Sequence, residues 1–265
     1  HMGRFDSFYL FSDVDGTLMT SEYTIPQANI DALRRFTREG GHFALATGRG
    51  VSSSTFDLLE SLPVNAPCVL LNGALLYDGE KRERLECFYL PPSAREMVER
   101  LLAEVSDCSV SIWRAEGKYE VGYEHPKMAG FPAFYTKCDV LPDPWCKLVI
   151  RTTPLEQAGL VRYLEGMRLE GLRVVTSCDS FVEVMPWNVS KATGIETLAE
   201  KLGIARNHIL TMGDYYNDYE MLVLPGARRF CPENTPEDLK ALCERSFCRV
   251  ERGAVAALIE MLERE

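Results

Sequence analysis

The sequence has few histidines and few positive charges. Its 4 histidines are spread over 265 residues, so they form no cluster that could ligate a metal ion. Lysine and arginine together number 29, against 39 aspartates and glutamates, which gives a formal net charge of −10. This balance disfavours a general surface for nucleic acid or for an anionic membrane. An anionic ligand would therefore need a local positive site.

Long hydrophobic runs are also missing. The apolar stretches are far shorter than the roughly 20 residues of a membrane span, and the first residues lack the basic and then apolar pattern of a signal peptide. We therefore expect a soluble, cytoplasmic protein. The 9 cysteines occur singly, without a CxxC pair, which gives little support to a zinc site or a disulfide framework. Hydrophobic residues make up 46% of the chain, enough for a substantial buried core.

The first third of the chain alternates between strand and helix patterns. Three short apolar runs that end in glycine or polar residues lie at 8–13, 42–49 and 68–73. We predict that they are buried strands whose carboxyl ends carry functional loops. Helical spacing across 26–39 stops at Gly40, and a second helix is predicted over 53–61. This alternation predicts a parallel, doubly wound sheet with a site at the carboxyl ends of its strands.

From about residue 82 the pattern changes to a mixed α/β module. The predicted elements are a strand at 85–90, a helix at 93–105, a hairpin of 110–113 and 118–123, loops over 124–145, a strand at 147–152, a helix at 155–168, and strands at 172–177 and 181–185. Ser93 is a plausible cap of the first of these helices. We interpret residues 82–187 as a smaller domain inserted into a core that comprises 1–81 and 188–265.

After Pro186 the alternation of strand and helix returns. The predicted elements are helices at 191–202, 218–224, 235–243 and 254–262, and strands at 208–214 and 227–231. The N-terminal and C-terminal thirds should therefore share one sheet.

Residues 8–17 are the most informative stretch, because an apolar strand runs directly into Asp13 and Asp15 and then into a Gly-Thr turn. Strand alternation places the two carboxylates on the same side. An acidic pair next to a glycine that brings backbone N–H groups close to a ligand suits a nucleophile and a general acid around a phosphate and a hard cation. The alternative, two acids that only cap a turn, is weaker, because acids after a buried strand need a compensating cation.

Three further segments carry related chemistry: Ala46-Thr47-Gly48-Arg49, Ser190-Lys191, and Gly213-Asp214-Tyr215-Tyr216-Asn217-Asp218. With the first, they resemble in order and chemistry the four motifs of the haloacid dehalogenase (HAD) superfamily of phosphotransferases. The insertion before Lys191 is similar to the type-two α/β cap of the Cof-type branch, subfamily IIB. The resemblance covers nearly the whole chain. It implies a Rossmann-like core with an inserted cap, and a Mg²⁺-dependent phosphatase acting on a small phosphorylated metabolite, such as a sugar or polyol phosphate.

The resemblance also implies a metal site built from acids. Asp13 would be the nucleophile that forms an aspartyl-phosphate, with its other oxygen on Mg²⁺. Asp15 would serve first as general acid and then as general base, and would bind the metal through its backbone carbonyl. Asp214 would complete the metal shell. Asp218 would orient the metal's waters or Lys191.

The phosphoryl group would be held by a second set of residues. Thr47 and the backbone N–H groups around Gly48 would donate to its oxygens, and Lys191 would offset the negative charge. Asn217 would contact phosphate or Lys191. We give equal weight to two interpretations of Asn72-Gly73, part of the site or an ordinary turn. We interpret Arg49 as a structural or salt-bridging residue.

Simpler readings exist for several of these residues. Lys191 alone would be a solvated lysine in the first turn of a helix, and Asp214 and Asp218 would be acids at a helix start. Two other functions also stay open: a phosphomutase with the same chemistry, and a catalytically silent, metabolite-sensing scaffold. In each case we expect a small phosphorylated metabolite as partner, neither nucleic acid nor membrane, and a monomer or a weak homodimer.

Overall fold

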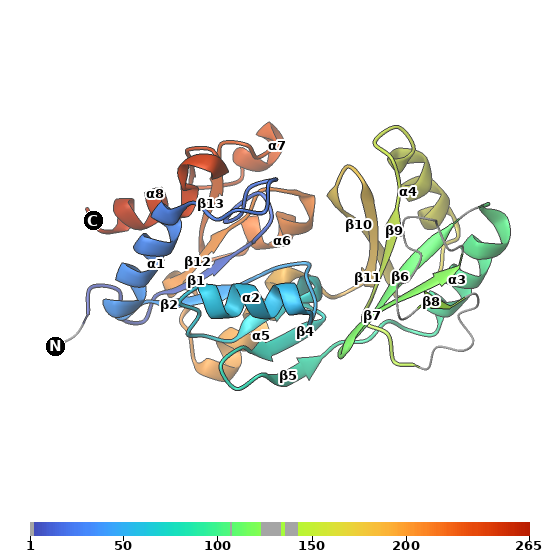
Figure 1. Cartoon of the computed structure of the whole chain (residues 1–265), viewed down its shortest axis with the longest axis horizontal. Helices are drawn as coiled ribbons and strands as arrows, with labels where there is room; N and C mark the ends of the chain where they lie inside the picture. Colours follow the sequence, from blue (N-terminus) through green and yellow to red (C-terminus); the bar gives the residue numbers. More distant parts are fainter. Residues whose placement is uncertain (1–2, 107, 123–133, 136–142) are drawn as a thin grey trace. The chain divides into compact units, whose positions relative to one another are not determined.

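The apolar runs near both ends of the chain form one five-stranded parallel sheet (Figure 1). The computed structural model describes residues 3–106, 108–122, 134–135 and 143–265. The strands of this sheet are β1 (Tyr9–Ser12), β2 (His42–Leu45), β12 (Ile209–Met212), β13 (Arg228–Pro232) and β14 (Arg245–Phe247). Their spatial order is β14-β13-β12-β1-β2, and every neighbouring pair is parallel. The sharing of one sheet by the two outer thirds is confirmed.

β1 lies between β2 and β12, so its carboxyl end meets theirs. Tyr9 pairs with His42 on one side and with Ile209 on the other. Beyond the strand, the backbone N–H of Asp13 donates to the carbonyl of Met212 at 2.8 Å. Segments almost 200 residues apart in sequence are thereby joined at the edge of the sheet where α/β proteins build their sites.

Helices cover this sheet and supply its apolar packing. They are α1 (Gln27–Arg38), α2 (Ser53–Ser61), α5 (Lys191–Leu202), α6 (Tyr219–Leu222), α7 (Glu237–Lys240) and α8 (Ala254–Leu262), with the 3₁₀ turns η1 (Leu71–Gly73), η4 (Arg206–His208), η5 (Tyr216–Asp218) and η6 (Val250–Arg252). α1 and α8 lie side by side (Figure 1). α1 buries Leu33 and Phe36, which follow helical spacing, so the amphipathic pattern identifies its inner face.

A second, three-stranded sheet follows the first two strands. It consists of β3 (Cys68–Leu70), β4 (Leu75–Asp78) and β5 (Glu83–Cys87), in that order. A single parallel bridge between Ala46 and Val69 links β3 to the end of β2. The prediction that the run at 68–73 continues the parallel sheet therefore holds only for this bridge. β4 was not predicted, because its apolar residues continue the preceding run without alternation.

The middle of the chain forms a six-stranded sheet with two helices. Its strands are β6 (Ser109–Arg114), β7 (Gly117–Gly122), β8 (Phe134–Tyr135), β9 (Lys147–Arg151), β10 (Leu172–Cys178) and β11 (Phe181–Pro186), in the order β10-β11-β9-β6-β7-β8, and its helices are α3 (Ser93–Glu104) and α4 (Gln157–Gly166). One face carries the apolar core, in which Ile112, Leu148 and Val184 are buried with residues of α3 and α4. Alternation along the strands places Ser111 and Glu183 on the other face.

The chain divides into two compact units, one running up to Glu86 and again from Ser190, and the other from Cys87 to Val189. The bounds of the inserted domain predicted at 82–187 differ by only a few residues from those of the second unit. Most of the loops predicted at 124–145 lie outside the described residues. None of the helices in the described parts has the length and hydropathy needed to cross a bilayer.

Several local predictions were wrong. Ser93 does not cap α3: the N-cap is Pro92, and the Ser93 hydroxyl donates instead to the carbonyl of Glu170 at 2.7 Å. α7 covers only Glu237–Lys240 rather than 235–243, because Pro236 fixes an extended approach to the helix. The short strand β14 was not predicted, since three residues carry too little periodicity.

Candidate active site

Asp13 stands at the centre of the candidate site. Its side chain is buried, and its Oδ1 accepts a hydrogen bond of 2.7 Å from the Lys191 ammonium. Burial, with the negative charge of Asp218 in second place, raises the pKa of Asp13 well above its usual range, while Lys191 opposes the shift. The carboxylate is therefore stable in its ionised form only when cations balance the charge around it.

Lys191 begins α5, where a capping box fixes the backbone: the Ser190 hydroxyl accepts from the N–H of Thr193, and the Thr193 hydroxyl accepts from the N–H of Ser190. The Lys191 side chain is completely buried, and its Nζ lies 2.7 Å from Asp13 Oδ1 and 2.5 Å from Asp218 Oδ1. Burial alone would lower the pKa of Lys191, but the two carboxylates outweigh it and raise the pKa above its ordinary value. A solvated lysine of the first turn is excluded.

Asp214 and Asp218 form the acidic side of the site. The Thr17 hydroxyl donates to Asp214 Oδ1 at 2.7 Å, and Asp218 Oδ2 accepts from the backbone N–H of Asp214 at 2.8 Å. Both residues are buried. Burial, helped by the charge of Asp218, raises the pKa of Asp214 to about 7. Acids that only start a helix would be exposed, so this simpler reading does not describe them.

Three carboxylates converge here on one ammonium. Oxygens of Asp13, Asp214 and Asp218 all lie within 4.8 Å of one another, and Lys191 is the cation that contacts two of them. Oxygen donors of this kind suit a hard divalent ion such as Mg²⁺. Gly16 leaves room for the cluster, since it has a φ of +84° and an added Cβ would lie 2.3 Å from Asp214 Oδ2.

Asp15 has a different environment from Asp13. β1 ends at Ser12, so the expected strand alternation does not extend over the two acids. The Asp15 side chain is 53% exposed, and Arg49 holds both of its oxygens, with Nε at 2.9 Å and Nη2 at 2.7 Å. The interpretation of Arg49 as a salt-bridging residue is confirmed, and its partner is the expected general acid.

Thr47 and Gly48 follow β2 and form a loop beside this pair. The backbone N–H of Thr47 donates to the carbonyl of Val69 at 2.9 Å, and the buried Thr47 hydroxyl accepts from the N–H of Arg49 at 3.1 Å. That contact uses a lone pair of the hydroxyl oxygen, so the hydroxyl proton can still be donated to an anion. The loop is thus suited to phosphoryl oxygens.

Asn217 and Asn72 meet inside the site. The Asn217 amide nitrogen donates to Asn72 Oδ1 at 3.2 Å, and both side chains are buried. Asn72 and Gly73 belong to the turn η1, which packs against α5. The turn therefore lies next to predicted site residues.

Two contributors were not assigned from sequence. Thr17 holds Asp214, as described above. Asn234 links the loop after β13 to the first motif, because its amide nitrogen donates to the carbonyl of Gly16 at 2.9 Å and its oxygen accepts from the N–H of Val250 at 3.0 Å. Thr17 could have been found from its place directly after the acidic pair. Asn234 stands in register with the asparagine that follows the fourth motif in the family that the sequence resembles.

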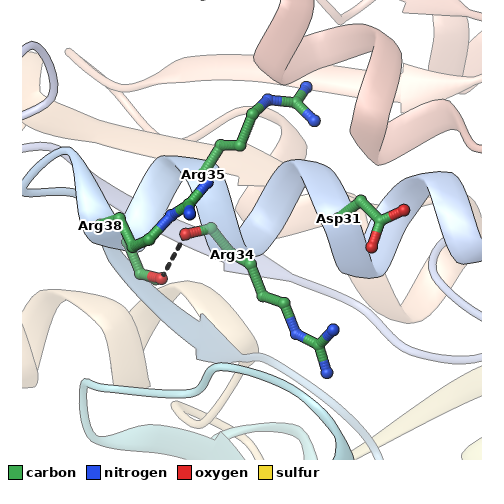
Figure 2. Close-up of a pocket in the computed structure, with 5 residues that line it drawn as sticks. Asp31, Arg34, Arg35 and Arg38 are labelled. Atoms are coloured by element: carbon green, nitrogen blue, oxygen red, sulfur yellow. Dashed lines mark hydrogen bonds between the residues drawn. The ribbon is translucent and has the colours of Figure 1, made fainter.

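A hollow of about 490 Å³ on α1 is a separate feature (Figure 2). It is lined by Asp31, Arg34, Arg35, Thr37 and Arg38. Arg35 is already paired with Glu263 at 3.1 Å, and the Thr37 hydroxyl donates to the Arg34 carbonyl. None of these lining residues is one of the predicted site residues.

Known proteins resemble this chain in sequence and in fold. The family model for haloacid dehalogenase-like hydrolases matches residues 10–259. A protein of Streptococcus pyogenes with the name "Putative phosphatase" is 26% identical, over 88% of this chain and 89% of its own. The fold matches that of BT1666 from Bacteroides thetaiotaomicron, a phosphatase of the HAD superfamily, with a TM-score of 0.79 and 22% identity over 98% of this chain and 96% of that one.

A second solved structure has the same architecture. The HAD subclass IIB sugar phosphatase BT4131 superposes with a TM-score of 0.79 at 18% identity, over 97% of this chain and 99% of that one. The predicted fold class and the predicted family are both confirmed. The chain belongs to the haloacid dehalogenase-like hydrolases, in their Cof-type branch.

Proposed function

We propose that this hydrolase is a Mg²⁺-dependent phosphatase that acts on a small phosphorylated metabolite, a sugar or polyol phosphate, through an aspartyl-phosphate on Asp13. One observation carries the proposal. The buried Asp13 shares a single ammonium with Asp218, while Asp214 lies in the same cluster. One monovalent cation cannot balance three buried carboxylates, so the site is suited to a divalent ion, which an anionic substrate would then contact.

Asp13 and Asp214, with the backbone carbonyl of Asp15, would hold the metal ion. Asp218 lies close enough to join them, although its contact with Lys191 supports the role of orienting that lysine. When bound, the ion supplies positive charge that keeps Asp13 ionised and neutralises the phosphoryl group. The oxygen-only donor set and the space that Gly16 leaves beside Asp214 fit such an ion.

The chain's own residues then account for both half-reactions. A carboxylate oxygen of Asp13 attacks phosphorus, a bond forms between them, and the bond from phosphorus to the leaving oxygen breaks. To act as general acid, Asp15 would leave its ion pair with Arg49 and bind a proton. It would give this proton to that oxygen and later take one from the water that hydrolyses the acyl phosphate. The phosphoryl oxygens are held by Thr47, Gly48, Lys191 and Asn217 while the charge of the phosphoryl group is redistributed.

The unit Cys87–Val189 would act as a cap that selects the substrate. Its support is that the chain enters it after the second motif and leaves it before the third, as in an insertion. The sugar phosphate class rests on the likeness to a protein described as a sugar phosphatase. A cap that covers the substrate would exclude water during phosphoryl transfer.

The test is phosphate release from a panel of phosphorylated sugars, polyols and nucleotides, with Mg²⁺ and with excess EDTA. We expect Mg²⁺-dependent release that falls by about 1000-fold or more in Asp13→Asn. Asp31→Asn, an exposed acid on α1, is the matched control and should keep full activity. Turnover that survives in Asp13→Asn, or that persists in EDTA, contradicts the proposal. Isomerised sugar phosphate in place of free phosphate would indicate a phosphomutase.

A further inference from the structure

The turn after β3 has an unusual backbone. Leu71 and Asn72 have φ values of +50° and +53°, and Gly73 follows with +104°. L-amino acids with a side chain rarely adopt this left-handed region, and a leucine tolerates it less well than asparagine. All three residues are buried. Such a conformation persists only where the surrounding structure enforces it, and it is often found at functional sites.

Two hydrogen bonds tie the turn to the loop after β2. The backbone N–H of Leu71 donates to the carbonyl of Arg49 at 2.9 Å, and that of Asn72 donates to the carbonyl of Thr47 at 3.0 Å. These acceptors belong to the segment proposed to bind phosphoryl oxygens. The left-handed turn therefore holds in place the loop after β2, which is the segment proposed to bind phosphoryl oxygens.

The same turn also touches the start of α5. An added Cβ at Gly73 would lie 2.0 Å from the Ser190 carbonyl oxygen, which precedes Lys191. Only glycine fits at this position, both for its φ and for this contact. The approach determines the path of the backbone on both sides of Gly73, and so the place of the Asn72 side chain.

The Asn72 side chain points to the fourth motif, where its Oδ1 accepts from Asn217 Nδ2 at 3.2 Å. A primary amide has a donor end and an acceptor end of nearly equal shape, and a neighbour decides which end faces which way. An acceptor at Asn72 turns the donor end of Asn217 toward itself. The nitrogen carries two hydrogens, and one of them serves this contact, so the second can donate to a phosphoryl oxygen.

We propose that Asn72 is a positioning residue for phosphate: through the contact between its Oδ1 and Asn217 Nδ2, it sets the orientation in which the Asn217 amide meets the phosphoryl group. The inference rests on the proposed function, because it needs Asn217 to contact phosphate. The left-handed turn holds Asn72 in place, and asparagine is the residue with a side chain that best combines this backbone with an amide acceptor.

The experiment is a double-mutant cycle with Asn72→Gly and Asn217→Ala. Glycine adopts the left-handed conformation freely, so Asn72→Gly removes the amide and keeps the turn. Asn65→Ala is the control: its amide contacts only backbone atoms near the start of β2 in the described structure, accepting from Phe43 and donating to Gly41. The readouts are kcat, KM and the inhibition constant of inorganic phosphate, with thermal unfolding as a check of folding.

We expect Asn72→Gly to weaken phosphate inhibition and raise KM by about tenfold each, as loss of an oriented hydrogen bond to a charged group requires. The double variant should then match Asn217→Ala within about twofold, and Asn65→Ala should leave phosphate inhibition unchanged. The role of Asn72 would be overturned if the effects of the two single variants multiplied in the double variant. It would also be overturned if Asn72→Gly folded and was inhibited by phosphate as strongly as the wild type. Either result would leave the proposed function intact. A wild-type protein that neither hydrolyses esters nor binds phosphate would overturn the proposed function and this inference together.

Discussion

At the scale of single residues, the site is a balance of buried charges. Lys191 contacts Asp13 and Asp218 without any exposure to solvent, and Asp214 lies within the same group of acids. Taking charges out of water is costly, and removing one partner leaves the others uncompensated. Each residue of the cluster should therefore affect stability as well as activity, in a manner that depends on pH and on metal.

The first prediction concerns stability against pH without metal. The folded-state pKa of Asp214 is raised from 3.8 to about 7, so between these values the folded state binds more protons than the unfolded state. The contribution of Asp214 to the free energy of unfolding is complete below pH 3.8 and is lost as the pH rises through about 7. In EDTA, the wild type should therefore lose roughly 2 kcal/mol or more relative to Asp214→Asn between pH 5 and pH 8.

Urea unfolding of the two proteins at both pH values measures this difference. Equal changes in the wild type and in Asp214→Asn would show that burial and the neighbouring acids do not raise the pKa of Asp214. Added Mg²⁺ should reverse the trend, because the ion binds the ionised carboxylates of the folded state.

The second prediction concerns Asp15 as general acid. Asp15→Asn should reduce kcat/KM for alkyl phosphates by about 100-fold or more, because their leaving oxygen needs a proton. p-Nitrophenyl phosphate has a leaving group that departs as an anion, so its kcat/KM, which reports formation of the aspartyl-phosphate and not its hydrolysis, should fall much less. Comparable losses for both kinds of ester would assign Asp15 a role in binding rather than in proton transfer.

At the scale of elements, the site depends on how loops end their strands. β1, β2 and β12 are parallel neighbours, and the loops after them carry the first, second and fourth motifs. α5 adds Lys191 from a capped first turn. Glycine is required where these loops come close together, as at Gly16 beside Asp214.

The third prediction is that Gly16→Ala weakens the metal site. The new Cβ would lie 2.3 Å from Asp214 Oδ2 at a backbone φ of +84°, so the carboxylate must shift from the position in which Thr17 holds it. We expect the Mg²⁺ concentration for half-maximal activity to rise by about tenfold, with a loss of stability of roughly 1–3 kcal/mol.

Gly159→Ala is the matched control for this substitution. Gly159 lies in α4, and an added Cβ there meets no atom within 4 Å. Alanine should raise the stability by about 0.5–1 kcal/mol and leave the Mg²⁺ dependence unchanged. A Gly16→Ala protein with the wild-type Mg²⁺ dependence would refute the close approach of the two loops.

The strands that carry the motifs can be predicted from the sequence, whereas the contacts between loops cannot. β1, β2 and β12 are apolar runs that end in chemistry-bearing residues, so periodicity and composition locate them. The short strands β4 and β14 lack a period. The pairings of Arg49 with Asp15 and of Asn72 with Asn217 join loops far apart in the chain, and only the packed sheet brings them together.

At the scale of the whole molecule, the chain interrupts one unit with another. The predicted metal and phosphate residues all belong to the unit that contains the parallel sheet, and none belongs to Cys87–Val189. Metal binding should therefore leave its direct mark on the first unit, while substrate selection would be assigned to the second.

The fourth prediction follows from this division. Mg²⁺ alone should slow backbone hydrogen exchange most in residues 13–17 and 213–218, since these loops carry the acids that would hold the ion. Exchange in β6 and β9 of the second unit should change little. Hydrogen-exchange mass spectrometry with and without Mg²⁺ measures both regions. Protection confined to the second unit would place the metal elsewhere.

Chemical trapping of the intermediate shows whether Asp13 is the nucleophile. The protein would be mixed with Mg²⁺ and a substrate that it turns over, quenched in acid within one turnover, digested, and analysed by mass spectrometry. We expect one phosphoryl group on the peptide that contains Asp13, and none in Asp13→Asn. A phosphoryl group on another residue, or turnover that proceeds with no covalent phosphoryl-enzyme at all, would contradict it.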